Sequence, residues 1–288
     1  MASQHTIETA IQQRYSCRTY RETPLTMDEY HALEQMLSRP PTCPRGSKVR
    51  FDIIAATPEN TAALKGLLTY GIIKHPAGFI LGAVESSDFD LEDYGYVMES
   101  IILDLVRMGM GTCWLGGTFN KSVFAQKIGV GANEAIPAVV AVGHLAPKRM
   151  MEKLIRMGSR AHQRKPWPDL FFNQTFNTPL SPEDAGSYRD PLEMIRIAPS
   201  ASNKQPWRIV KENGCLHFYL QRTKNYYKRY NRLIGMADLQ RIDMGIAMCH
   251  FELSAKARGL KGEWVSEDPN QSTLPPLTSY VRSWRMAD

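Results

Sequence analysis

DYGYVMESIILDLVRMGMGTCW (residues 93–114) and DMGIAMCHFELSAKARGLKGEW (residues 243–264) align without a gap at an offset of 150 residues, which is 243 minus 93. Each segment predicts a long helix, because apolar residues recur at four-residue spacing, as at Val97, Ile101 and Leu105. A glycine follows each helix and supplies a stop signal. The alignment indicates two copies of one unit. Its six identical pairs are Asp93/Asp243, Gly95/Gly245, Met98/Met248, Leu103/Leu253, Gly109/Gly259 and Trp114/Trp264.

Shorter matches extend this duplication over the chain and divide it into two halves, residues 1–150 and 151–288. Each half carries a basic N-terminal segment, a capped helix, a loop, one or two strands, the long helix and a final strand. Because strands and helices do not alternate strictly, we expect an α+β fold rather than a doubly wound parallel sheet. Two such copies are expected to pack about a pseudo-two-fold axis. The shorter matches are Gln13-Arg14 with Gln163-Arg164, 23–26 with 178–181, 33–36 with 192–195, and Pro40 with Pro199.

Composition is that of an ordinary globular protein, with 43% hydrophobic and 22% charged residues in a chain of 288. The sequence has no apolar run of the roughly 18 residues that a membrane span needs, and its N-terminus does not resemble a secretory signal. We therefore expect a cytoplasmic protein with no membrane partner. The five cysteines are scattered without a C-x-x-C pair. This spacing predicts neither a disulfide framework nor a metal site.

The net charge of +6 raises the alternative of a nucleic-acid-binding module. The densest basic stretch, residues 222–232, also contains tyrosines that could stack on bases. No arginine-aromatic module or Cys/His finger accompanies it. We interpret the stretch as a solvated face and expect no nucleic-acid partner.

The two halves differ where a ligand would bind. Arg14, Ser16 and Arg18 stand at alternate positions, so in an extended segment their side chains point the same way. Two guanidinium groups and a hydroxyl aimed at one place suit a phosphate, which arginine binds through paired, charge-assisted hydrogen bonds. The second half has Arg164-Lys165-Pro166-Trp167-Pro168 there, with two prolines, and is expected to have lost this function.

Two other loops differ in the same complementary way. After the long helix, the first half has the glycine pair Gly116-Gly117, whose bare backbone lets a flat ligand approach closely. The second half has Ser266-Glu267 instead. Conversely, the second half has the loop APSASNKQPW at 198–207, and the first half has an unlike sequence at 40–47.

Taken together, these motifs resemble the nitroreductase superfamily of FMN-dependent oxidoreductases. The motifs are Arg-x-Ser-x-Arg at 14–18, Leu-Gly-Gly at 115–117, Gly143-His144-Leu145 followed by Lys148-Arg149, and the loop at 198–207. The resemblance covers most of the chain, divided over its two halves. It implies two halves, each with a small, mainly antiparallel sheet flanked by helices, that imitate the two subunits of an ordinary homodimer.

The resemblance also implies one flavin site per chain, built from both halves, and a decayed second site. Arginines near the N-terminus and at position 149 would hold the phosphate, and the loop at 199–205 would pack against the isoalloxazine ring. The backbone amides at 115–117 would meet the polar edge of that ring. The implied cofactor-binding residues are Arg14, Tyr15, Ser16, Arg18, Tyr70, Gly71, Leu115, Gly116, Gly117, Lys148, Arg149, Pro199, Ser200, Ala201, Ser202, Asn203 and Gln205.

The function implied by the resemblance is transfer of hydride from NADH or NADPH, through N5 of FMN, to a small electron-poor acceptor such as a nitroaromatic or a quinone. No side chain is assigned a catalytic role, because the flavin carries the chemistry. A monomer would suffice for one flavin site. The alternative is a non-catalytic protein that stores or senses FMN.

Overall fold

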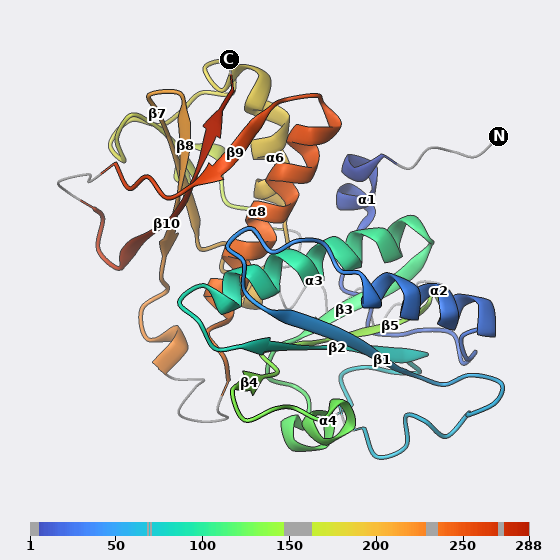
Figure 1. Ribbon diagram of the computed structural model, residues 1–288. Coiled ribbons are helices and arrows are strands. Elements are labelled where there is room, and N and C mark those ends of the chain that lie inside the picture. Colours follow the sequence, from blue (N-terminus) through green and yellow to red (C-terminus); the bar gives the residue numbers. More distant parts are fainter. Residues whose placement is uncertain are drawn as a thin grey trace.

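The computed structural model describes residues 6–67, 69, 71–146, 163–228, 236–269 and 274–287. It contains two five-stranded sheets, with a pair of long helices between them (Figure 1). The first part contains α1 (Ile7–Gln13), α2 (Met27–Ser38), β1 (Val49–Ala55), β2 (Gly78–Glu85), α3 (Asp90–Arg107), β3 (Met110–Leu115), α4 (Lys121–Ile128), β4 (Glu134–Ala135) and β5 (Val139–His144). The second contains η1 (Trp167–Asp169), β6 (Phe171–Asn173), η2 (Gly186–Tyr188), α6 (Arg189–Ile197), η3 (Ala201–Asn203), β7 (Trp207–Glu212), β8 (Cys215–Gln221), α8 (Leu239–Ala257), β9 (Gly262–Val265) and β10 (Thr278–Met286).

The strand order of the two sheets follows one plan. The first sheet runs β1-β2-β5-β3, with β4 beside β2, and the second runs β7-β8-β10-β9, with β6 added beside β7. The long helix α3 lies between β2 and β3 in sequence, and α8 lies between the corresponding strands β8 and β9. Within the described part of the chain, strand pairing is antiparallel except between β6 and β7. The predicted α+β class with two mainly antiparallel, helix-flanked sheets is confirmed.

The long helices α3 and α8 form the central contact between the two parts, as Figure 1 shows where the green and orange helices meet. They approach closely at the repeated glycines: a Cβ atom on Gly95 would overlap the carbonyl oxygen of Ile242, and one on Gly245 would overlap that of Glu92. A side chain at either position would therefore hold the two backbones apart. This reciprocal contact explains why glycine stands at both copies of the position.

The ends of both long helices also follow the sequence. Gly109 and Gly259 come two residues after the last residue of their helices and have φ of +80° and +72°. Glycine adopts this left-handed conformation without steric cost, and it ends a helix. The capped helix expected in the first half is α2, where Thr26 and Glu29 form a capping box.

One continuous apolar core joins both parts. It contains the inward faces of α3 and α8, including Val97, Ile101 and Phe251, together with buried residues from both sheets. A second cluster covers the other face of the first sheet, where Phe124 of α4 packs edge-on against Phe79 of β2. In the described ranges, no helix is long and apolar enough to cross a membrane.

Replacing Gly245 with alanine tests the helix crossing. We expect Gly245→Ala to lower the free energy of unfolding by about 1–3 kcal/mol, because the added Cβ meets backbone that cannot rotate away. Gly95→Ala should act in the same direction. The measurement is urea unfolding followed by circular dichroism. Gln35→Ala, on the exposed side of α2, is the control and should leave the midpoint nearly unchanged; an unchanged midpoint for both glycine variants would contradict the crossing.

Candidate functional site

A cavity of about 760 Å³ lies where the two parts meet. Its walls come from the N-terminal segment, the end of β3, the loop before β7 and the first turns of α8. Its volume falls within the range of small-molecule and cofactor sites, about 300–1,000 Å³. Its lining residues include Ser16, Arg18, Lys74, Leu239, Ile242, Asp243 and Ile246.

The cavity brings together most of the residues expected from the sequence. Arg14 and Tyr15 do not line it; they line a smaller cavity of about 130 Å³. Asn203 and Gln205 are not among its lining residues either, and they bond to the segment before η1. Tyr70, Lys148 and Arg149 lie outside the described residues. The expected residues that share the large cavity are Ser16, Arg18, Gly71, Leu115, Gly116, Gly117, Pro199, Ser200, Ala201 and Ser202.

The N-terminal segment reaches the cavity by pairing with the first sheet. Ser16 forms an isolated parallel bridge with Thr112 of β3, and the backbone N–H of Cys17 donates to the Thr112 carbonyl at 2.8 Å. Tyr20 is fully buried and donates its hydroxyl to the Ala141 carbonyl. These contacts fix Ser16 and Arg18 beside the strand that ends at Leu115.

The strand end of the first part packs directly on α8 of the second. A Cβ atom on Gly116 would overlap the side chain of Leu239, the first residue of α8. Leu239, Ile242 and Ile246 recur on one face of that helix and give the cavity an apolar wall. A largely apolar ring in this cavity would contact these aliphatic side chains.

The serine-rich loop is held in a strained conformation. Ser202, Asn203 and Gln205 have φ of 49°, 53° and 48°, a region that non-glycine residues adopt at a cost of about 1–3 kcal/mol each. Several hydrogen bonds offset this cost. The Gln205 N–H donates to Ser200 Oγ at 2.9 Å, and Gln205 Oε1 accepts from the Lys165 N–H at 2.8 Å. Strain that the surrounding structure maintains is typical of ligand-binding loops.

Arg164 also holds the loop. Its guanidinium donates to Asn203 Oδ1 and to the Ile197 carbonyl, both at 3.0 Å. Burial, with Arg14 nearby, lowers the pKa of Arg164 to about 10. The sequence suggested only a lost phosphate motif at this position, because the partner at position 203 is distant in the chain. The structure instead gives Arg164 a supporting role behind the loop.

Arg14 lies beside a buried acid rather than in the large cavity. Its Nε is 3.7 Å from Glu99 Oε1, and both side chains are almost fully buried. Trp114 Nε1 donates to Glu99 Oε2 at 2.7 Å, and His250 Nε2 lies 2.9 Å from Glu99 Oε1. This cluster connects the N-terminal motif to both long helices.

The repeated aspartates Asp93 and Asp243 each hold a loop, but not equally. Asp93 accepts two backbone N–H groups, from Arg45 at 3.0 Å and from Ser47 at 2.9 Å. Asp243 accepts one, from Ala201 at 2.8 Å, and lines the cavity. Burial raises the pKa of Asp243 well above its ordinary value. Asp243 was not among the residues expected in the site, although its identity with Asp93 in the aligned segments indicated that this position matters.

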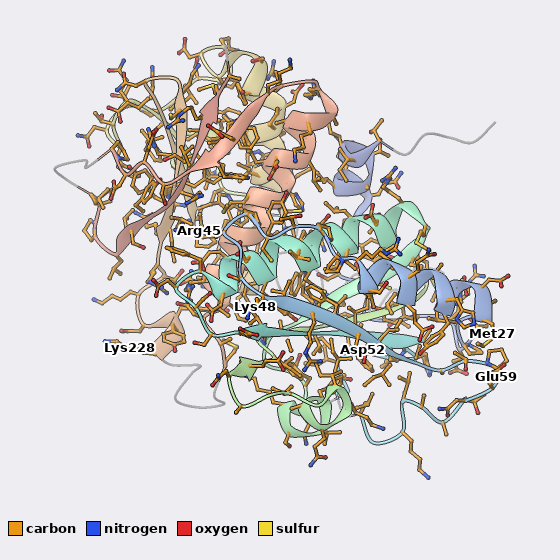
Figure 2. All side chains as sticks on the ribbon, viewed as in Figure 1. Met27, Arg45, Lys48, Asp52, Glu59 and Lys228 are labelled. Carbon is orange, nitrogen blue, oxygen red and sulfur yellow. The ribbon has the colours of Figure 1, made fainter. Side chains whose placement is uncertain are left out.

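An arginine occupies the mirror position, which we define as the place where residues 40–47 meet β10. Arg45 Nη1 donates to the Val281 carbonyl at 2.7 Å, and the guanidinium lies over the Phe89 ring. In Figure 2, Arg45 lies on the loop that passes above the start of α3, facing the second part. Burial and the nearby Arg282 lower the pKa of Arg45 to about 10. The equivalent residue in the large cavity is the small Ala201, because its N–H bonds to Asp243 as the Arg45 N–H bonds to Asp93.

These features fit a flat cofactor with a phosphate, such as FMN. Arg18 and Lys74 provide positive charge for a phosphate, and Gly116 and Gly117 contribute backbone to the cavity wall. The second carboxyl oxygen of Asp243 is buried, and it has no hydrogen-bond partner among the described residues.

Comparisons with known proteins agree with this fold. The family model "Putative TM nitroreductase" matches residues 6–255. The crystal structure of a "putative nitroreductase" from Thermotoga maritima covers 98% of this chain and 94% of its own, with a TM-score of 0.59 and 17% identity. A search of curated proteins gave no match.

Two solved structures cover about half of the chain. A nitroreductase with bound FMN from Desulfitobacterium hafniense covers 50% of this chain and 90% of its own, with 16% identity and a TM-score of 0.39. A nitroreductase family protein from Clostridium difficile covers 52% and 91%, with 18% identity and a TM-score of 0.39. Because the family model spans most of the chain, from the N-terminal motif through α8, this protein belongs to the TM nitroreductase family.

Proposed function

We propose that the protein is an FMN-dependent oxidoreductase of the cytoplasm that takes electrons from NADH or NADPH and reduces a small electron-poor acceptor, such as a nitroaromatic or a quinone. One observation carries the proposal. A single cavity of about 760 Å³ is lined by Ser16 and Arg18, by the glycine pair after β3, and by the serine-rich loop from the other part of the chain.

In this proposal each wall of the cavity has a role. Ser16 and Arg18, with Lys74, would bind the phosphate, and Lys148 and Arg149, which lie outside the described residues, would add positive charge. The N–H groups of residues 115–117 would bind the polar edge of the ring, and the loop at 199–202 would pack against the ring. Arg14 and Tyr15 support the phosphate-binding segment from outside the large cavity, and Asn203 and Gln205 support the loop through their bonds to the segment before η1.

When bound, FMN supplies the redox chemistry by accepting hydride from the nicotinamide and passing it to the acceptor. The protein positions the ring and excludes bulk water on one side with Leu239, Ile242 and Ile246 of α8. Ile72, Tyr226 and Met236 also line the cavity. Because FMN would carry the redox chemistry, no side chain of the protein is assigned a proton-transfer role.

We also propose that residues 1–150 and 151–288 are duplicated halves, so that one chain supplies both sides of one flavin site. Reciprocal glycine contacts between α3 and α8 and the shared strand order support this division. The mirror position, where Arg45 contacts Val281, is not expected to bind flavin.

Absorbance of the purified protein tests the function. We expect yellow protein with about one FMN per chain, bleached within seconds when NADH or NADPH is added without oxygen. Yellow protein that is inert to both nucleotides would instead indicate a flavin-binding protein, and colourless protein that does not take up added FMN would contradict the proposal. A stoichiometry near two would contradict the assignment of the mirror position.

Replacing Arg18 with alanine tests the phosphate site. A charge-assisted hydrogen bond to phosphate contributes about 1.5–3 kcal/mol, so Arg18→Ala should weaken FMN binding roughly 10- to 100-fold. Its affinity for riboflavin, which has no phosphate, should change little. The measurement is quenching of flavin fluorescence on titration. Arg21→Ala is the control, since Arg21 lies on the same segment but not in the cavity; equal losses for both variants, or for both flavins, would refute this assignment.

Replacing Arg164 with alanine tests the support of the loop. The change removes two hydrogen bonds to Asn203 and Ile197, and we expect it to lower the free energy of unfolding by about 1–3 kcal/mol. It should also raise the rate of protease cleavage within 199–205. Arg189→Ala, at the exposed start of α6, serves as the control. A variant as stable and as resistant to cleavage as the control would show that Arg164 does not hold the loop.

A further inference from the structure

A buried carboxyl oxygen in the wall of the cavity is left without a partner. Asp243 is 2% exposed. Its Oδ1 accepts the Ala201 N–H at 2.8 Å, whereas its Oδ2 has no hydrogen-bond partner within the part of the chain that the structure describes. Buried polar atoms in folded proteins are nearly always hydrogen-bonded, and an exception in a cavity wall points to a ligand.

The equivalent residue of the other half shows what a purely structural aspartate looks like. Both oxygens of Asp93 accept backbone N–H groups, from Arg45 and Ser47, so its bonding capacity is used by its own loop. Asp243 occupies the same place on α8 and holds the equivalent loop with only one bond. The aspartate with the unpartnered oxygen therefore belongs to the half whose loop lines the cavity.

The surroundings of Asp243 favour its protonated form. The side chain is removed from water, and Asp238, at the start of the same helix, adds a negative charge that opposes ionisation. Arg222 pairs with Asp238 at 2.5 Å, and Arg18 and Lys74 lie in the wall of the same cavity. The charged groups that face α8 from other elements are mostly paired: Asp90 and Glu92 with Arg241, Glu99 with His250, and Glu8 with Arg258.

A protonated carboxyl group has one O–H donor and keeps an acceptor. Since Oδ1 accepts from Ala201, the proton belongs on Oδ2. We propose that Asp243 is a ligand-binding residue that, as the neutral acid, donates a hydrogen bond from Oδ2 to an acceptor atom of the flat heteroaromatic molecule in the cavity. The inference rests on the proposed function, in which that molecule is FMN, whose ring nitrogens and carbonyl oxygens are acceptors.

Two substitutions separate this role from a structural one. Asp243→Asn keeps an acceptor for Ala201 on Oδ1 and a donor on Nδ2, so FMN affinity should stay within about threefold of the parent. Asp243→Ala removes the donor, and loss of one neutral hydrogen bond should weaken FMN binding about tenfold. Both affinities are measured by quenching of FMN fluorescence with the full chain.

Asp93 provides the matched control. Asp93→Asn places an amide N–H₂ against one of two backbone donors, so it should unfold at lower urea concentration than the parent. Its FMN affinity should nevertheless be unchanged, because Asp93 holds the loop of the mirror position. Asp243→Asn should lose little stability, because its amide oxygen still accepts the Ala201 N–H, and its FMN affinity should also stay near that of the parent.

Infrared difference spectroscopy reads the proton directly. Subtracting the spectrum of Asp243→Asn from that of the parent should reveal the C=O stretch of a protonated carboxylic acid, and that band should shift when FMN is added. A carboxylate spectrum, a band that FMN does not move, or unchanged FMN affinity in Asp243→Ala would each overturn the proposal. If the parent itself does not bind FMN, the proposed function fails instead, and the titration of the parent distinguishes the two results.

Discussion

The close approach of α3 and α8 is the constraint on which the rest of the molecule depends. Gly95 and Gly245 bring each helix against the backbone of the other, so the crossing point is fixed without an intervening side chain. Asp93 and Asp243 stand two residues before these glycines and hold the two loops. The crossing therefore constrains the position of the loop at 199–205, which Asp243 of α8 holds in the wall of the cavity.

The proposed duplication accounts for one open cavity and one occupied location. The two parts share their strand order and the aspartate-glycine pair, and in each part the aspartate holds a loop against the long helix. At one location the loop presents small residues such as Ala201, and at the other it presents Arg45, whose guanidinium contacts Phe89 and Val281. A side chain of that size, hydrogen-bonded to backbone, competes directly with a planar ligand.

The sequence predicted those features that depend on periodicity or on repeated identity. The long helices, their glycine ends and the α+β class follow from local patterns, and the structure agrees. It did not predict that Arg14 lies beside Glu99 or that Arg164 bonds to Asn203, because each partner is distant in the chain and no local pattern reports such a contact. The importance of Asp243 was missed for a related reason, since an unsatisfied atom can be recognised only when all of its neighbours are known.

Buried acids on the long helices connect the core to the proposed site. Trp114 and Trp264, which are repeat partners, donate their indole N–H to Glu99 and Glu252 on α3 and α8. Glu99 also contacts His250 across the helix pair, so the strand that ends at Leu115 is tied to both helices through one carboxylate. Because unsatisfied buried charges are costly, such a network resists displacement of either helix. The walls of the cavity are thus held by the same contacts that join the two parts of the chain. Ligand binding there carries no additional free-energy cost for ordering those walls.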